Sequence, residues 1–157
     1  MMKPASISTL RKELDLLPPK ELSHLCLRLA KFSKENKELL SYLIFDAGDE
    51  ETFIKNVKVL IKAQFEEINT SHMFYVRKSI RKILRTTNKY IRYSGQKQTE
   101  AELLIFFCQT LKASGIRYQR VTSLNNLYQN QLIKIQKALA LLHEDLQFDY
   151  QQELELL

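Results

Sequence analysis

The sequence predicts an all-α protein, and three observations support that prediction. Glycine and proline each occur only three times in 157 residues, too few for the many tight turns of a β-sandwich or barrel. The chain is rich in residues that favour helices, such as Leu, Lys, Glu, Ala and Gln. Apolar residues recur at steps of three and four along most of the chain, which is the spacing of one face of a helix.

Residues that begin or end helices mark the joints between these segments. Gly48, Gly95 and Gly115 each follow a periodic apolar stretch, as expected of left-handed residues that terminate helices. Thr99 opens a capping-box pattern, and Pro18-Pro19 suits the end of one helix and the start of the next. These signals predict a short helix at 6–15 and further helices at about 19–33, 36–47, 50–68, 72–94, 99–114 and 120–144.

The connections between these helices are short, so successive helices must turn back on one another. This favours an up-and-down bundle of about six to seven helices, with residues 1–157 forming a single helical domain. The alternative is a short stack of helical hairpins, although the segments share no repeated signature. Within the domain, 1–17 is expected to be an N-terminal arm with a short helix, and the acidic segment 145–157 is either frayed or docked.

Two helices stand out as the core of the predicted bundle. Leu103–Cys108 is apolar all round, so we expect its helix to be central and covered on several sides. The helix at 120–144 carries an apolar seam that suits a partner helix, either within the chain or in a homo-oligomer. Cys26 and Cys108 both lie in apolar segments, and each is expected to be a small buried hydrophobe.

Export, membrane insertion and metal binding find no support in the sequence. There is no signal peptide at the N-terminus, and the longest apolar run is far too short to cross a bilayer. Glu21 and His24 have the Glu-x-x-His spacing of di-iron bundles, but neither His72 nor His143 supplies the second pair that such a site needs. We therefore expect a cytoplasmic protein with no metal and no cofactor.

No catalytic motif is present either. The sequence contains no Gly-rich phosphate-binding loop, no nucleophile elbow and no His-Glu-x-x-His segment. A non-enzymatic role is therefore favoured, and an enzyme whose site forms only in three dimensions ranks third among the functions we consider.

The most polarised part of the sequence lies between Ile68 and Thr99. It holds eight cations and no acid, whereas the whole chain has a net charge of +6, so the remaining residues are slightly acidic. On a helix, the cations through Arg92 gather on one side and an apolar stripe on the other. The candidate anion-binding residues are Arg77, Lys78, Arg81, Lys82, Arg85, Lys89, Arg92 and Lys97, with Tyr75 and Tyr93 available for stacking.

This basic helix, 77–97, predicts an interaction module that binds an anionic partner, either nucleic acid or an acidic protein surface. No helix-turn-helix, zinc finger or RNP-like strand is present, so nucleic-acid binding would be led by phosphate contacts. The alternative is a structural protein or homodimer in which acids such as Glu66, Glu67 or the C-terminal segment neutralise the basic face.

Overall fold

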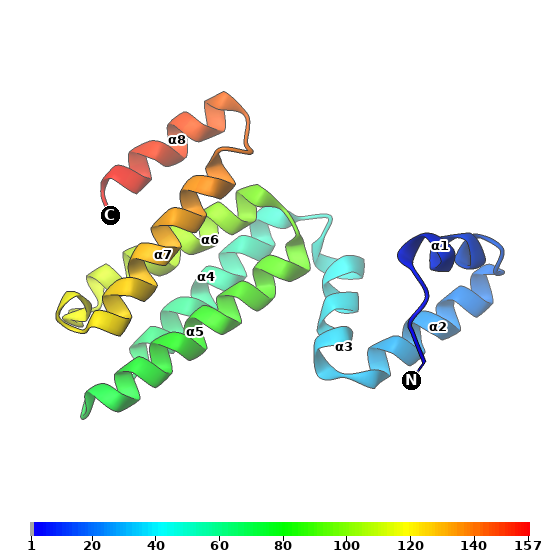
Figure 1. The fold of residues 1–157 in the computed structure, drawn as a ribbon, viewed down its shortest axis with the longest axis horizontal. Helices are drawn as coiled ribbons and strands as arrows, with labels where there is room; N and C mark the ends of the chain where they lie inside the picture. The colour runs from blue at the N-terminus through cyan, green and yellow to red at the C-terminus, as the bar shows by residue number, and fades with distance from the viewer. Residues whose placement is uncertain (1) are drawn as a thin grey trace. The chain divides into compact units, whose positions relative to one another are not determined.

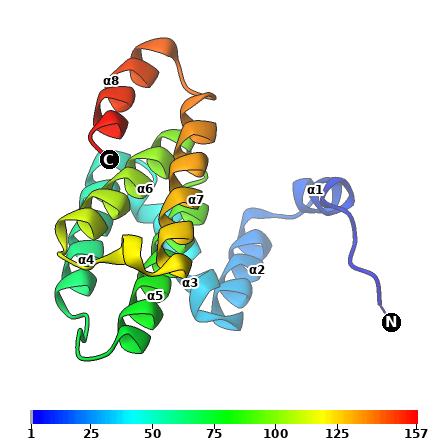
Figure 2. The same cartoon turned by 60° about the vertical axis from the view of Figure 1, so that its left-hand side comes forward.

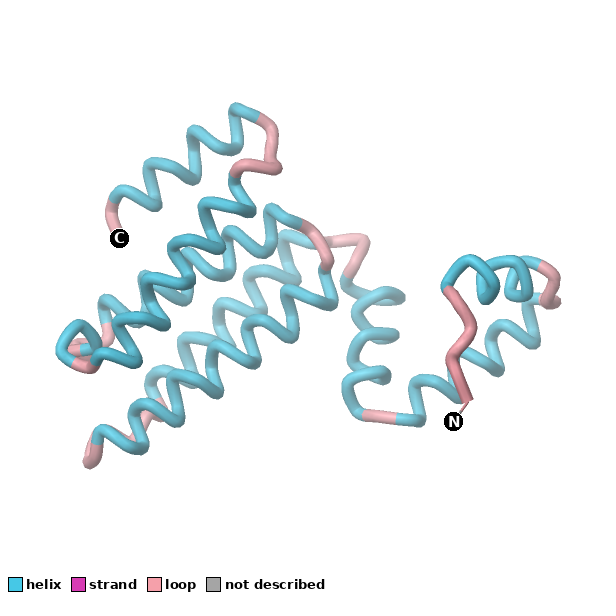
Figure 3. The backbone as a smooth tube through the Cα atoms, in the orientation of Figure 1, coloured by secondary structure: helices cyan, strands magenta, loops and turns pink. Residues whose placement is uncertain are grey.

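A computed structural model describes residues 2–157, and every regular element in that range is a helix (Figures 1 and 3). The predicted all-α class is therefore confirmed. Contacts within the chain divide it into two compact units, Met1–Phe45 and Asp46–Leu157, and each unit is described by itself. The prediction of one domain over 1–157 stays a prediction.

The N-terminal unit contains the helices α1 (Ile7–Asp15), α2 (Pro19–Phe32) and α3 (Lys34–Ser41). Local caps explain their starts: the Ser6 hydroxyl accepts from the Thr9 amide, Pro19 opens α2, and the Ser33 hydroxyl accepts from the Asn36 amide. The Asn36 side chain then donates to the Leu29 carbonyl at 2.8 Å. This bond ties the start of α3 to the end of α2.

The N-terminal unit has almost no core of its own. Between residues 2 and 45, the only buried apolar residues are Ala30 and Tyr42, and every residue of α1 is exposed. Cys26 is also exposed, so the prediction that it is a buried hydrophobe was wrong. The reason is that a helix with an apolar stripe buries it only where enough neighbours surround it, and this unit has few.

The C-terminal unit is a bundle of five α-helices (Figures 1 and 2). They are α4 (Glu50–Glu66), α5 (Met73–Ser94), α6 (Lys97–Ala113), α7 (Thr122–Leu139) and α8 (Glu144–Glu155), with a 3₁₀ turn at Tyr118–Arg120.

Helix α6 lies at the centre of this bundle, in contact with α4, α5, α7 and α8. Leu103, Leu104 and Phe107 are completely buried, which confirms the prediction of a central apolar helix. Cys108 is buried beside them, as predicted.

Two predicted helix boundaries need correction. Gly95 and Gly115 are left-handed as expected, with φ of 67° and 77°, but Gly48 is not. There the helix ends through a π turn at Tyr42–Asp46, and the Asp49 amide donates to the Asp46 carbonyl, so no left-handed residue is needed. Thr99 is not an N-cap, because α6 already begins at Lys97.

Thr99 instead serves a tertiary contact that outweighs the local capping preference. Its side chain is completely buried, and its hydroxyl donates to the Glu50 carboxylate at 2.6 Å. The Ser94 hydroxyl bonds to the same carboxylate oxygen. Glu50 therefore joins the start of α4 to the end of α5 and the start of α6.

The acidic C-terminal segment is docked rather than frayed, and it forms an eighth α-helix that we had not predicted. The Tyr150 hydroxyl donates to the Glu102 carboxylate at 3.0 Å and accepts from the Gln98 amide at 3.1 Å. Burial raises the pKa of the Tyr150 phenol to about 12, so the hydroxyl remains a donor even well above neutral pH. The Lys112 ammonium donates to the Leu156 carbonyl at 2.8 Å. These bonds hold α8 against α6.

The apolar seam of the helix predicted at 120–144 packs inside the chain. Leu124, Tyr128, Ile135 and Ala138 on α7 are buried, and α7 lies along α6. Homo-oligomerisation through this helix stays a prediction, and it would have to use the opposite, exposed side around Ile133.

We expect Thr99→Val to lower the free energy of unfolding by about 2 kcal/mol, because it removes a buried bond to a carboxylate that joins two helices. Thr87→Val is the matched control, because Thr87 is equally buried but its hydroxyl bonds to the Ile83 carbonyl of its own helix. This substitution should lower the free energy of unfolding by less than about 1 kcal/mol. Urea denaturation measures both. Equal losses would contradict the importance of the Glu50 junction.

The two thiols should react very differently with an alkylating reagent at neutral pH. Burial raises the pKa of the Cys108 thiol to about 12, and the thiolate is the reactive form. We expect mass spectrometry to find Cys26 labelled in the native protein, and Cys108 labelled only after denaturation. Rapid labelling of native Cys108 would contradict the packing of α6.

Candidate anion-binding site

Helix α5 separates its residues into a buried side and a charged side. Val76, Ile80, Ile83 and Ile91 are buried, and α5 packs on α4 and α6. Because a helix turns by about 100° per residue, the cations between these positions are directed away from the core. Gly95 ends the helix in the left-handed conformation.

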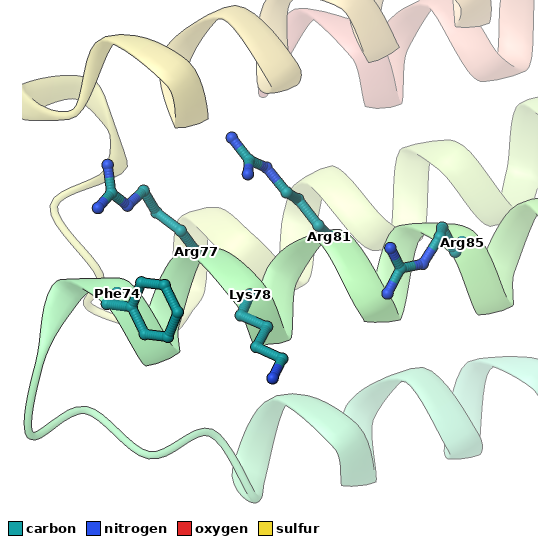
Figure 4. A pocket seen from close by; sticks show the side chains of 5 residues that line it. All are labelled: Phe74, Arg77, Lys78, Arg81 and Arg85. Carbon is teal, nitrogen blue, oxygen red and sulfur yellow. The ribbon is translucent and has the colours of Figure 1, made fainter.

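A shallow hollow of about 430 Å³ lies on the charged side of α5. It is lined by Phe74, Arg77, Lys78, Arg81 and Arg85 (Figure 4). In Figure 4 the Arg77 and Arg81 side chains extend to the same side of the helix, and Lys78 extends to the other. These five residues, here called the basic hollow, bring three guanidinium groups, an ammonium group and an aromatic ring around one hollow.

The cations of the basic hollow have no acidic partner within residues 2–157. The same is true of Lys82 and Arg92, which are exposed. Glu66 and Glu67 are exposed and pair with none of these cations, and the acidic helix α8 packs on α6 and α7. Neutralisation by a second subunit stays a prediction.

The remaining predicted residues lie outside the hollow. Lys97 belongs to α6, where it pairs with Glu100 at 2.6 Å, so the basic helix ends at Gly95. Lys89 is half-buried, with its ammonium 5.0 Å from the centre of the Tyr90 ring. Tyr93 is buried, and its ring packs edge-on against that of Tyr90. The prediction that Tyr93 is available for stacking on a partner was therefore wrong. Tyr75 is exposed.

Phe74 is the site residue that sequence reasoning missed. Its side chain is 61% exposed, and its ring meets that of Tyr75 edge-on, with 5.6 Å between the ring centres. The signal was present in the sequence, because Phe74 precedes Lys78 by four residues and Arg81 by seven, which places all three on one helical face. Together with the exposed ring of Tyr75, the Phe74 ring provides an aromatic surface beside the arginines of the hollow.

A second polar hollow, of about 420 Å³, lies between α4 and α6, and its charged groups are already engaged. Glu102 pairs with Lys58 at 2.6 Å and also accepts from Tyr150. Glu50 accepts from Ser94 and Thr99. We interpret these side chains as structural, because each stabilises a junction between helices.

Metal ligands do not converge in the part of the chain that the structure describes. No group of three His, Cys, Asp or Glu side chains is close enough to hold an ion, and both Glu21 and His24 are exposed. Among the helices of residues 2–157, none is long and apolar enough to cross a bilayer.

No protein-family model, curated protein or solved structure matches this chain. Function is therefore inferred from the residues of the basic hollow and their surroundings.

Reversing one charge in the basic hollow should stabilise the protein. Arg81 lies four residues from both Arg77 and Arg85, so Arg81→Glu replaces two repulsive pairs by attractive ones and should raise the free energy of unfolding by roughly 0.5–1 kcal/mol. Lys58→Glu is the control, since Lys58 has an ion-pair partner and its reversal should cost about 1–2 kcal/mol. Denaturant titration at low salt measures both. A large loss with Arg81→Glu would indicate an acid covering this face.

Proposed function

We propose that this chain is a non-enzymatic module that binds nucleic acid through the basic hollow of α5. The observation that carries the proposal is the combination of Phe74 with Arg77, Arg81 and Arg85 on one exposed surface, with no acidic partner in residues 2–157. The proposal includes a cytoplasmic location, where nucleic acid is available and the exposed Cys26 thiol would stay reduced.

The arginine row has the chemistry and spacing to contact a nucleic-acid backbone. Each guanidinium can donate two parallel hydrogen bonds to phosphate oxygens. The three arginines follow one another at four-residue steps, so they span about 12 Å along the helix. A single strand advances about 3.4 Å per nucleotide, and the row therefore covers three to four nucleotides.

Phe74 favours nucleic acid over an acidic protein surface. Carboxylates of an acidic protein surface would pair with the arginines, but they would not interact with the exposed Phe74 ring at the end of the row. An unpaired base has a flat face that stacks on such a ring, while its phosphate reaches the neighbouring arginine. Because duplex bases stack on each other, we expect a preference for single strands.

Fluorescence anisotropy with a labelled single-stranded oligonucleotide tests the proposal. We expect binding at low salt, with a slope of roughly −3 in a plot of log affinity against log salt, as for about four phosphate contacts. Arg81→Glu/Arg85→Glu should weaken binding by at least about tenfold. Phe74→Ala should weaken it by about tenfold, the contribution of one stacked base.

Two controls separate the parts of the proposal. Lys134→Glu/Lys137→Glu changes the net charge equally but lies on α7, so it should bind nearly as well as the unmodified chain. Heparin is anionic and has no bases, so Phe74→Ala should leave heparin binding unchanged. Absence of binding at low salt, or equal loss in both double variants, would overturn the basic hollow as the site.

The alternative function is binding of an acidic protein surface, which the same arginines would also favour. It becomes the better account if Phe74→Ala binds oligonucleotide as tightly as the unmodified chain while Arg81→Glu/Arg85→Glu still loses binding. A homodimer in which acids of a second copy neutralise α5 is the remaining candidate. It would appear as self-association that Arg81→Glu/Arg85→Glu abolishes.

A further inference from the structure

The N-terminal unit exposes more apolar surface than its size accounts for. Of the twenty large hydrophobic residues that are exposed within 2–157, twelve lie between residues 2 and 45, including Leu29 at 64% exposure and Phe32 at 86%. Scattered exposed leucines are ordinary, but a concentration of this kind marks a surface that another molecule covers.

A groove of about 750 Å³ between α2 and α3 gathers part of this surface. Its apolar lining, here called the floor, consists of Leu27, Ala30, Leu40, Ile44 and Phe45. All of its lining residues belong to the N-terminal unit. The groove is therefore a property of α2, α3 and the turn that follows them.

The rim of this groove is basic. Lys31, Lys34 and Lys37 line it, and no acidic side chain does. Lys31 and Lys37 form no ion pair within the described residues, whereas Lys34 lies 3.7 Å from Glu38. A complementary occupant must present an apolar side chain to the floor and carboxylates to the rim.

The outer face of α8 has this composition. Phe148 is 66% exposed, although Tyr150 on the opposite side of the helix is buried against α6. Glu144 and Glu155 lie four residues before and seven residues after Phe148, on the same face, and both are exposed. Helix α8 carries five acids and no basic residue.

We propose that α8 of a second copy of this chain docks in the groove, with Phe148 on the apolar floor and Glu144 and Glu155 facing the lysine rim. Docking uses only the outer face of α8, so the inner face keeps its contacts with α6. The contact joins two different surfaces, and each chain carries one of each. Such contacts either close into a ring or reciprocal pair, or propagate along a chain of copies.

The expected affinity is modest. Rim ion pairs steer the partner but contribute little in water, so most of the free energy comes from the apolar contact. Because the contact involves only one helix face, we expect a dissociation constant on the order of micromolar. Salt should weaken the association without abolishing it.

Sedimentation velocity on the full chain tests the proposal. We expect the mass to rise above the monomer value of 18.5 kDa as the concentration reaches high micromolar. Phe148→Asp removes the apolar anchor and Lys31→Glu/Lys37→Glu reverses the rim, so each variant should sediment as a monomer. Circular dichroism confirms that the variants stay folded, since all three substituted residues are exposed.

A mixing experiment gives the sharpest outcome. Phe148→Asp keeps an intact groove, and Lys31→Glu/Lys37→Glu keeps an intact α8, so an equimolar mixture should form a two-chain complex although neither variant associates alone. Val59→Asp, an exposed position on α4, is the control and should associate like the unmodified chain. The proposal is overturned if the unmodified chain remains monomeric, if Phe148→Asp associates normally, or if the mixture stays monomeric.

Discussion

The segment Leu103–Cys108 contains no charged or strongly polar side chain, and the arrangement of the C-terminal unit depends on covering it. Four helices of that unit, α4, α5, α7 and α8, each lie against α6. Each contributes one apolar side to this contact, and its other side is left facing outward. The direction in which α5 presents its cations is therefore a consequence of how α6 is buried.

The charge on α5 adds a second constraint. Arginines four residues apart repel each other on a helix, and the acids of α8, α4 and α6 are engaged in other contacts or lie elsewhere. A helix with this surface is stabilised by the core beneath it and destabilised by its own charge. An anion bound along the arginine row would relieve the repulsion and would therefore stabilise the folded chain.

The N-terminal unit presents the opposite situation, with apolar surface in place of charge. Three short helices cannot enclose the side chains that their own sequence pattern places on one face. Between residues 2 and 45, only Ala30 and Tyr42 have buried apolar side chains. The acidic outer face of α8 and the lysine-rimmed groove are complementary features of the same chain. Self-association through them would leave the basic hollow for a different, anionic partner.

The sequence by itself determined the helices from α1 to α7, the joints at Gly95 and Gly115, the central position of α6 and the separation of charge on α5, because each follows from a local pattern. It did not determine α8 or the π turn at Tyr42–Asp46. Other features could not be predicted from the sequence: Phe74 lines the basic hollow, and Tyr93 is buried. Lys97 forms an ion pair with Glu100, and Thr99 donates a hydrogen bond to Glu50. Those outcomes depend on which helices meet, and contacts between residues far apart in the chain leave no periodic signal. The same holds for Cys26, whose apolar surroundings predicted burial, while the tertiary structure provided no neighbours to cover it.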